Sequence, residues 1–152
     1  STTFSYSGDA SKIQFIFQDP FSALNGSKRV GWILESVLKR HRPDLSSVER
    51  LKEAESLLEE VGLSAADLRK RPKAFSGGQR QRIGIARALA AAPEVLICDE
   101  SVSALDVSVQ SQVLNVLNGI KKNRGLSMIF ISHDPDVIRY MCDRIVELTH
   151  LD

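Results

Sequence analysis

Residues 75–82 read Phe-Ser-Gly-Gly-Gln-Arg-Gln-Arg and open a run of apolar residues with helical period, namely Ile83, Ile85, Ala86, Leu89 and Ala90. Ser76 and Gln79 have the spacing of a capping box, which predicts that a helix begins here. Glycines at a helix start leave backbone N–H groups uncovered at the end where the helix dipole places positive charge. The stretch therefore predicts a first turn that binds an anion, most naturally a phosphate, although an ordinary capped helix entry has the same pattern.

The composition is that of an ordinary globular domain, with 43% hydrophobic and 26% charged residues among 152. A formal net charge of +1 gives no electrostatic reason to expect nucleic acid or anionic lipid as the main partner. No apolar run is long enough to span a membrane, and no signal peptide is apparent. Cys98 and Cys142 lie in apolar patterns, which favours a reducing compartment over a disulfide, so a cytoplasmic location is expected.

Pattern divides the chain into four segments. Residues 1–12 are small and polar without a period, which predicts a flexible leader. Residues 13–20 contain a short core strand, Ile13 to Phe17, followed by a break at a proline. Residues 21–92 predict an all-helical subdomain that ends in the helix after Ser76, and residues 93–152 predict a second α/β piece.

Three short helices are expected before residue 75. Val30 to Arg40 has one apolar face, and Ser46 with Glu49 predicts a capping box that starts a second helix. Ser64 to Lys70 predicts a short third helix. The residues expected to face inward from the second helix are Leu51, Ala54, Leu57, Leu58 and Val61.

Two carboxylates follow the apolar run that begins at Val95. Four apolar residues and then Asp99 and Glu100 predict a fully buried parallel strand whose carboxyl end points into a site. Asp99 is then placed to hold Mg²⁺, directly or through water, and Glu100 to polarise an attacking water. A strand that simply ends at two solvated acids is the alternative.

The rest of the chain predicts one long helix, two strands and, between the strands, a helix that starts at Asp134 and Pro135. Asp106 is the expected N-cap of a helix running to about Lys122. Ser127 to Ser132 predicts a second buried strand, which delivers His133. A histidine at a strand end is more often a hydrogen-bonded scaffold residue than a catalyst, and both readings stay open from spacing alone. Arg144 to Leu148 predicts a last strand.

The stretch Ser76-Gly77-Gly78-Gln79 resembles the signature motif of ATP-binding-cassette (ABC) ATPases, and its continuation to Leu89 resembles the branch that imports oligopeptides, dipeptides or nickel. The resemblance runs from about Gln14 to about Leu148. It implies an α/β fold: part of a P-loop nucleotide-hydrolase core, a parallel sheet with flanking helices, joined to an all-helical ABC subdomain. The arginines of the same helix can equally form a solvated face; they are Arg80, Arg82 and Arg87.

The resemblance also implies roles for single residues. Gln18 lies in a stretch similar to the Q-loop, which implies that it approaches Mg²⁺ and the attacking water. Asp99 and Glu100 resemble the end of the Walker B strand, which implies a metal ligand and a catalytic carboxylate. Residues 103–106 resemble the D-loop, so Asp106 is expected at a dimer interface. His133 is similar to the switch histidine that contacts the γ-phosphate.

The implied cofactors are ATP and Mg²⁺, and the implied partners are a second ATPase subunit and transmembrane permease subunits. In the family, the signature motif of one subunit covers the ATP held by the other, which assigns nucleotide contact to Ser76, Gly77, Gly78 and Gln79. The expected location is cytoplasmic, at the membrane surface beside the permease.

The chain contains no G-x-x-x-x-G-K-[ST] stretch. Such a loop of backbone N–H groups with its lysine gives these ATPases most of their grip on nucleotide. The resemblance implies that the loop belongs upstream of Gln18, so the sequence is expected to be a fragment that binds ATP weakly and hydrolyses it little or not at all. The open sheet edge of such a fragment predicts self-association.

Three functions are compatible with these patterns. The first is the ATP-hydrolysing subunit of an importer for peptides or related solutes. The second is a non-catalytic docking module that binds a membrane subunit through the loop after Gln18. The third is a chromosome-maintenance or DNA-repair ATPase, but those proteins insert long coiled coils where residues 21–75 show short capped helices and prolines.

Overall fold

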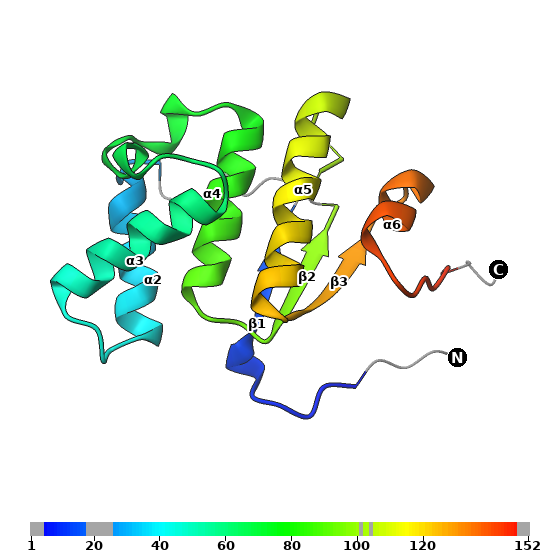
Figure 1. Ribbon diagram of the computed structural model, residues 1–152, viewed down its shortest axis with the longest axis horizontal. Helices are drawn as coiled ribbons and strands as arrows, with labels where there is room; N and C mark the ends of the chain where they lie inside the picture. Colours follow the sequence, from blue (N-terminus) through cyan, green and yellow to red (C-terminus); the bar gives the residue numbers. More distant parts are fainter. Residues whose placement is uncertain (1–4, 18–25, 101, 104, 149–152) are drawn as a thin grey trace.

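The computed structural model describes residues 5–17, 26–100, 102–103 and 105–148. Its elements are, in order, η1 Ala10–Lys12, β1 Ile13–Ile16, α2 Val30–His41, α3 Ser47–Glu60, η2 Ala65–Arg69, η3 Pro72–Ala74, α4 Gly77–Ala90, β2 Val95–Asp99, α5 Val107–Arg124, β3 Ser127–Ile131 and α6 Pro135–Met141. Figure 1 shows α2 and α3 on one side and the sheet with α5 and α6 on the other, with α4 between them. The predicted fold class, a parallel sheet with flanking helices, is confirmed.

The three strands form one parallel sheet in the order β1-β2-β3. Parallel pairing places all carboxyl ends at one edge of a sheet, which is the upper edge in Figure 1. Helices α4 and α5 lie over one face of the sheet and begin at that same edge (Figure 1). The edge therefore gathers strand ends and helix starts, the arrangement in which α/β proteins bind ligands.

Only one face of the sheet is covered within the described residues. Ile16, Leu96 and Cys98 point into the core shared with α4 and α5. On the opposite face Phe15 is 52% exposed, and Ile129 in the same register row is also exposed. The prediction of fully buried strands is therefore wrong for β2 and β3, because burial alternates with the pleat when helices cover one face alone.

The predicted strand from Arg144 to Leu148 is also wrong, because these residues form no regular structure. A strand exists only where its backbone groups pair with a neighbouring strand, and β3 carries no partner beyond β2 in the described sheet. Ile145 and Leu148 consequently remain exposed.

The helical part forms nearly as predicted. Ser46 accepts a hydrogen bond from the Glu49 backbone N–H at 3.2 Å, but the Glu49 carboxylate accepts from the Ser46 hydroxyl, so the reciprocal half of the capping box is missing. Leu51 was expected to face inward and is 45% exposed, which corrects that prediction. It lies at the edge of the apolar stripe that Ala54, Leu57 and Leu58 complete. The third helix is a 3-10 turn, η2.

The two parts share one hydrophobic core and are joined at their surface. Both oxygens of the Glu60 carboxylate lie 2.7 Å from guanidinium nitrogens of Arg124, a bidentate pair between the end of α3 and the end of α5. In the leader, the Tyr6 hydroxyl donates to Glu94 Oε2 at 2.8 Å, and Asp9 caps η1. Over the described stretches, no helix combines the length and apolar character needed to cross a bilayer.

Helix α4 packs closely against α5 at Gly78. A Cβ atom at that position would lie 2.2 Å from Val109 Cγ1, whereas one at Gly77 would lie 3.6 Å from Leu105 Cδ2, an ordinary contact. The β-branched Val109 has little rotamer freedom on a helix, so it yields poorly to an added methyl group.

We predict that Gly78→Ala lowers the free energy of unfolding by about 1–3 kcal/mol relative to Gly77→Ala, because it overpacks the α4–α5 contact. Both substitutions make the same chemical change within one helical turn, so the propensity gain of alanine is matched. Urea denaturation of the two variants measures the difference. Equal stabilities would show that α5 moves away without cost.

Candidate functional site

The start of α4 has the capping box that its sequence predicts. Ser76 Oγ accepts from the Gln79 backbone N–H at 3.3 Å, and Gln79 Oε1 accepts from the Ser76 backbone N–H at 2.9 Å. The amides of the first helical turn have no intrahelical carbonyl to bind. Ser76 and Gly77 are exposed, while Gly78 is buried against α5. The first turn can therefore offer backbone N–H groups to an anion at Gly77.

The end of β2 carries the two acids into a tight turn. Asp99 is the last strand residue and Glu100 follows with φ of 52°, in the left-handed region that a glutamate rarely adopts. Its backbone N–H donates to Ile131 O at 2.9 Å, and its carbonyl accepts from the Ser103 hydroxyl at 3.0 Å. These bonds hold the strained residue, and strain of this kind concentrates at functional sites.

His133 lies against Glu100. Its Nδ1 is 3.1 Å from each oxygen of the Glu100 carboxylate, although the two residues are 33 positions apart in sequence. With Nδ1–H donating to the carboxylate, Nε2 is the nitrogen that remains for a further contact. The side chain of His133 is 79% exposed and that of Glu100 is 28% exposed, so the pair opens to solvent. The geometry joins a carboxylate and an imidazole at one accessible point.

Asp106 occupies the N-cap position of α5, as predicted, but its side chain makes no capping hydrogen bond. The predicted capping contact is therefore wrong, and the carboxylate remains exposed beside the helix start. Leu105, its neighbour, lies near Gly77 at the start of α4. The structure thus brings the signature stretch together with the segment that resembles the D-loop.

The remaining predicted ligand, Gln18, lies outside the described residues. In the part of the chain that the structure describes, no three His, Cys, Asp or Glu side chains gather closely enough to hold a metal ion. Mg²⁺ usually takes one or two carboxylates and completes its shell with waters and substrate phosphates. The carboxylate of Asp99 at a strand end therefore fits such a site without a cluster.

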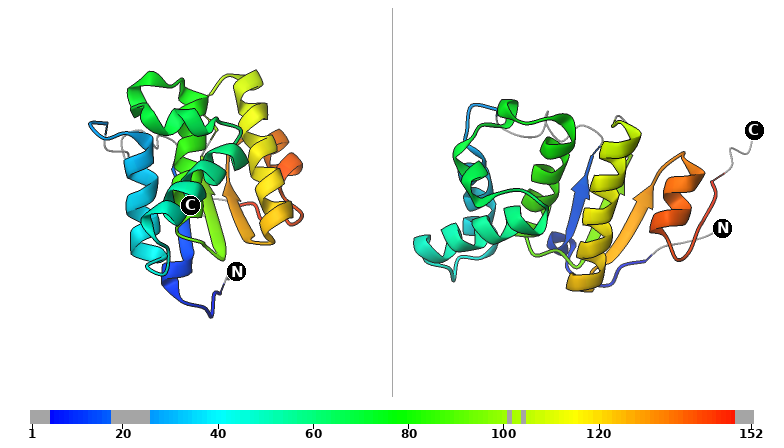
Figure 2. Two further views of the ribbon diagram at one scale, coloured as in Figure 1. Left: turned by 60° about the vertical axis from the view of Figure 1, so that its left-hand side comes forward. Right: turned by 45° about the horizontal axis from the view of Figure 1, so that its top comes forward.

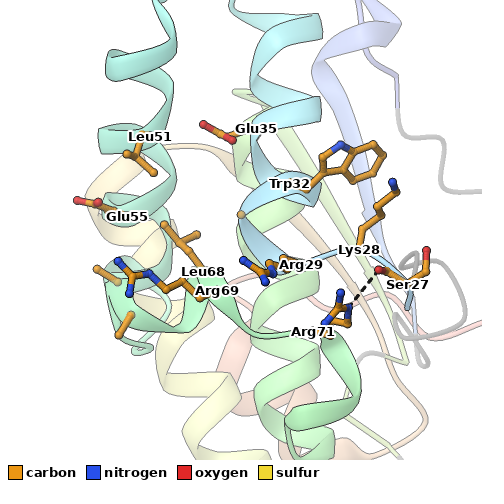
Figure 3. A pocket seen from close by; sticks show the side chains of 13 residues that line it. Ser27, Lys28, Arg29, Trp32, Glu35, Leu51, Glu55, Leu68, Arg69 and Arg71 are labelled. Atoms are coloured by element: carbon orange, nitrogen blue, oxygen red, sulfur yellow. Dashed lines mark hydrogen bonds between the residues drawn. The ribbon is translucent and has the colours of Figure 1, made fainter.

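A groove of about 780 Å³ lies between α2, α3 and η2, and sequence reasoning did not find it. Figure 3 shows Trp32, which is 50% exposed, beside Lys28, whose Nζ lies 5.0 Å from the indole centroid. Arg71 Nε donates to Ser27 O at 3.2 Å at the same end of the groove. Leu51 lines it from α3. The unexpected exposure of Leu51 is thus part of one concave surface.

Sequence reasoning also missed Gln81 on α4. Its side chain is polar and buried, and it is the one buried polar or charged residue among those that the structure describes. It stands four positions before Ile85, so the helical period placed it on the core-facing side. An amide at an expected apolar position was the available signal.

The arginines of α4 are half-buried, which corrects the reading of a solvated face: Arg80 donates to Phe75 O and Arg82 to Gly62 O. Burial lowers the pKa of Arg82.

Known proteins share both the sequence and this arrangement. A family model described as ABC transporter matches residues 5–103. The oligopeptide transport ATP-binding protein OppF of Haemophilus influenzae is 48% identical over 134 residues, which cover 88% of this chain and 40% of the relative. AmiF of Streptococcus pneumoniae, also an oligopeptide transport ATP-binding protein, is 49% identical over 88% of this chain and 44% of its own length. The chain thus spans about two fifths of these relatives.

Solved structures agree with the sequence matches. The ATP-binding cassette MJ0796, a dimer in a post-hydrolysis state bound to ADP and Pi, superposes with a TM-score of 0.71 at 30% identity, over 86% of this chain and 56% of that one. The protein cbiO1 from Clostridium perfringens, part of the ABC transporter complex cbiONQ, gives 0.77 at 28% identity, over 88% and 51%. With the signature stretch capping α4 and the strand-end acid beside His133, these matches establish that the chain belongs to the ABC transporter family.

Proposed function

We propose that this chain acts within the ATP-hydrolysing subunit of an ABC importer for peptides or related solutes. The contact between Glu100 and His133 at the carboxyl ends of neighbouring parallel strands is the observation that carries the proposal. The curated relatives named as oligopeptide transport and peptide import ATP-binding proteins support the solute class. The expected location is the cytoplasmic face of the membrane, beside the permease subunits.

Each site residue has a role in attack of water on the γ-phosphate. Glu100 orients the water and accepts a proton from it, as a positioned carboxylate does in general base catalysis. His133, with Nδ1 held by Glu100, directs Nε2 to a phosphate oxygen. Asp99 and Gln18 would hold Mg²⁺, and the ion would supply charge neutralisation at the phosphates. The given sequence contains no phosphate-binding loop of the G-x-x-x-x-G-K-[ST] kind.

A second ATPase subunit completes the site. The exposed Gly77 starts a helix with its positive dipole end outward, which suits the phosphates of an ATP held by the partner subunit. Gln79 fixes this turn through the capping box, and Gly78 lets α4 approach α5. Asp106, without an intrachain capping bond, lies beside that surface and meets the partner subunit.

The reading as a DNA-repair or chromosome-maintenance ATPase has less support. Helices α2 and α3 have 12 and 14 residues, too short for the long coiled coils of such proteins. The docking module is assigned to the loop after Gln18, and residues 18–25 lie outside the described residues, so that contact stays a prediction. The groove beside Trp32 is a second surface on the helical part that can bind a partner.

In an ATPase assembly that contains this chain, Glu100→Gln is expected to lower kcat by about 10²–10⁴-fold, because the amide removes the general base. Glu94→Gln is the matched control, since Glu94 lies at the other end of the same strand and contacts Tyr6. Phosphate release under saturating Mg-ATP measures both variants. The isolated chain is expected to show no turnover above background. Turnover that survives Glu100→Gln would contradict the assigned role.

The groove beside Trp32 is proposed to bind a cytoplasmic segment of the permease. Its lining carries four cationic side chains, Lys28, Arg29, Arg69 and Arg71, against two acidic ones, Glu35 and Glu55. Exposed aromatic and aliphatic side chains framed by cations suit an amphipathic helix with an acidic edge.

Trp32→Ala is expected to weaken binding of the permease about tenfold or more, because exposed tryptophans in concave surfaces are typical binding hot spots. Tyr140→Ala on α6 is the control, an aromatic of similar exposure outside the groove lining. Co-purification with detergent-solubilised permease measures the effect. Equal losses for both variants would argue against the groove.

The uncovered sheet face is proposed to make the isolated chain self-associate. Phe15 and Phe17 stack there with ring centroids 5.8 Å apart, and Ile129 and Ile131 extend the patch to β3. Contiguous exposed apolar surface of this kind favours association.

Light scattering is expected to give a mass that rises with concentration for the isolated chain and falls toward the monomer in Phe15→Ser, because the serine removes apolar surface from the patch. Val48→Ser on α3 is the control, since Val48 is also apolar and exposed but lies on the helical part. A monomer that resists concentration would refute the proposal.

A further inference from the structure

A side-chain amide joins α5 to the turn that follows Glu100. Gln110 lies at the end of the first turn of α5 and is half-buried. Its Nε2 donates a hydrogen bond to Val102 O at 3.0 Å, eight positions back in the chain. The Val102 side chain is itself 2% exposed and belongs to the hydrophobic core. The turn is therefore attached to the body of the molecule through both the side chain and the carbonyl of Val102.

This turn holds the backbone of Glu100 in its left-handed conformation, with φ of 52°. Strain of this kind persists only where the surrounding contacts over-determine the conformation. Ser103 supplies two such contacts, because its backbone N–H donates to Glu100 O at 3.3 Å and its hydroxyl at 3.0 Å. The backbone conformation sets the direction of the Cα–Cβ bond. The same contacts thus decide where the Glu100 carboxylate meets His133, 3.1 Å from Nδ1.

The Val102 carbonyl accepts two hydrogen bonds, which have different effects. The Leu105 backbone N–H donates at 3.1 Å, but this bond joins two residues of one loop and moves with it. The bond from Gln110 ties the loop to a helix, and that helix packs against α4 where Val109 lies close to Gly78. An apolar side chain at position 110 could cover the same surface without donating. The contribution specific to glutamine is thus a directional bond between loop and helix.

We propose that Gln110 is a positioning residue for Glu100, acting through the carbonyl of Val102 and the turn that Ser103 closes. The inference rests on the proposed function, which gives Glu100 its role as general base. Through α5, the turn that carries this base keeps a fixed position relative to the first turn of α4. One helix therefore aligns two parts of the site that are distant in sequence.

Kinetics in an ATPase assembly that contains the chain test the role. Gln110→Met keeps the length of the side chain and its helix propensity but removes the donor. It is expected to lower kcat about 2–10-fold, the worth of one hydrogen bond, with KM for ATP within about twofold. Gln110→Leu repeats the test if the methionine variant fails to fold. Gln112→Met is the matched control, an identical change at an exposed position of the same helix, and is expected to leave kcat unchanged.

A double-mutant cycle shows whether Gln110 acts through Glu100. In the Glu100→Gln background, Gln110→Met is expected to cause no further loss of the residual turnover, because the group that it positions is already gone. A residue that served stability alone would leave kcat unchanged in both backgrounds. A residue that acted elsewhere in the site would cause the same fold-loss in both.

A spectroscopic test reports on Glu100 directly, because Asp99-Glu100 is the one Asp-Glu pair in the chain. Labelling the chain with carbonyl-¹³C aspartate and ¹⁵N glutamate leaves a single cross-peak in a carbonyl–nitrogen correlation spectrum, from the peptide group between them. Glu100→Gln removes this cross-peak and so assigns it. Gln110→Met is expected to shift it, because the turn that holds the Glu100 backbone loses its bond to α5. Gln112→Met is expected to leave it in place.

The outcomes separate this inference from the proposed function. An unmoved cross-peak, an unchanged kcat, or an equal fold-loss in both backgrounds overturns the positioning role of Gln110 while Glu100→Gln alone still lowers turnover. Turnover that persists in Glu100→Gln overturns the proposed function whatever Gln110→Met does. A shifted cross-peak with a kcat that falls only when Glu100 is present, and neither effect in Gln112→Met, supports the inference.

Discussion

The parallel pairing of β2 with β3 is the interaction on which the candidate site depends. Its register places Asp99 beside Ile131, and the bond from the Glu100 N–H to Ile131 O extends the ladder by one step. The residues that follow each strand are thereby carried to the same edge, where Glu100 meets His133. Without this pairing, two residues far apart in the chain would have no reason to meet.

Helix α4 links that edge to the rest of the molecule. Its first turn is closed by the Ser76–Gln79 box, and the missing side chain of Gly78 allows contact with α5. One turn later Gln81 reaches back to β1. The same helix packs against α2 and α3 and also against α5 and β1, so it joins the helical part to the sheet (Figure 2). A displacement of the helical part would therefore move α4 and, through its contact with β1, the ends of the strands.

The two surfaces left open differ in chemistry. The sheet face that carries Phe15 and Ile129 exposes apolar side chains, whereas the groove beside Trp32 is concave and rich in cations. An exposed apolar face favours association with any apolar surface, and this association has little specificity. A charged groove instead selects a partner of complementary shape and charge. Solubility and recognition thus depend on separate parts of the chain.

The sequence by itself determined the local features. Capping of α4 by Ser76, the parallel strand ending at Asp99 and the helix start after Asp106 all follow from short-range patterns, since caps and periods are properties of neighbouring residues. Tertiary structure alone decided whether β2 and β3 are covered on two faces, whether Arg144 to Leu148 pair, and where Leu51 and Gln81 point. Each of these depends on which distant segment lies alongside, and spacing along the chain does not contain that information.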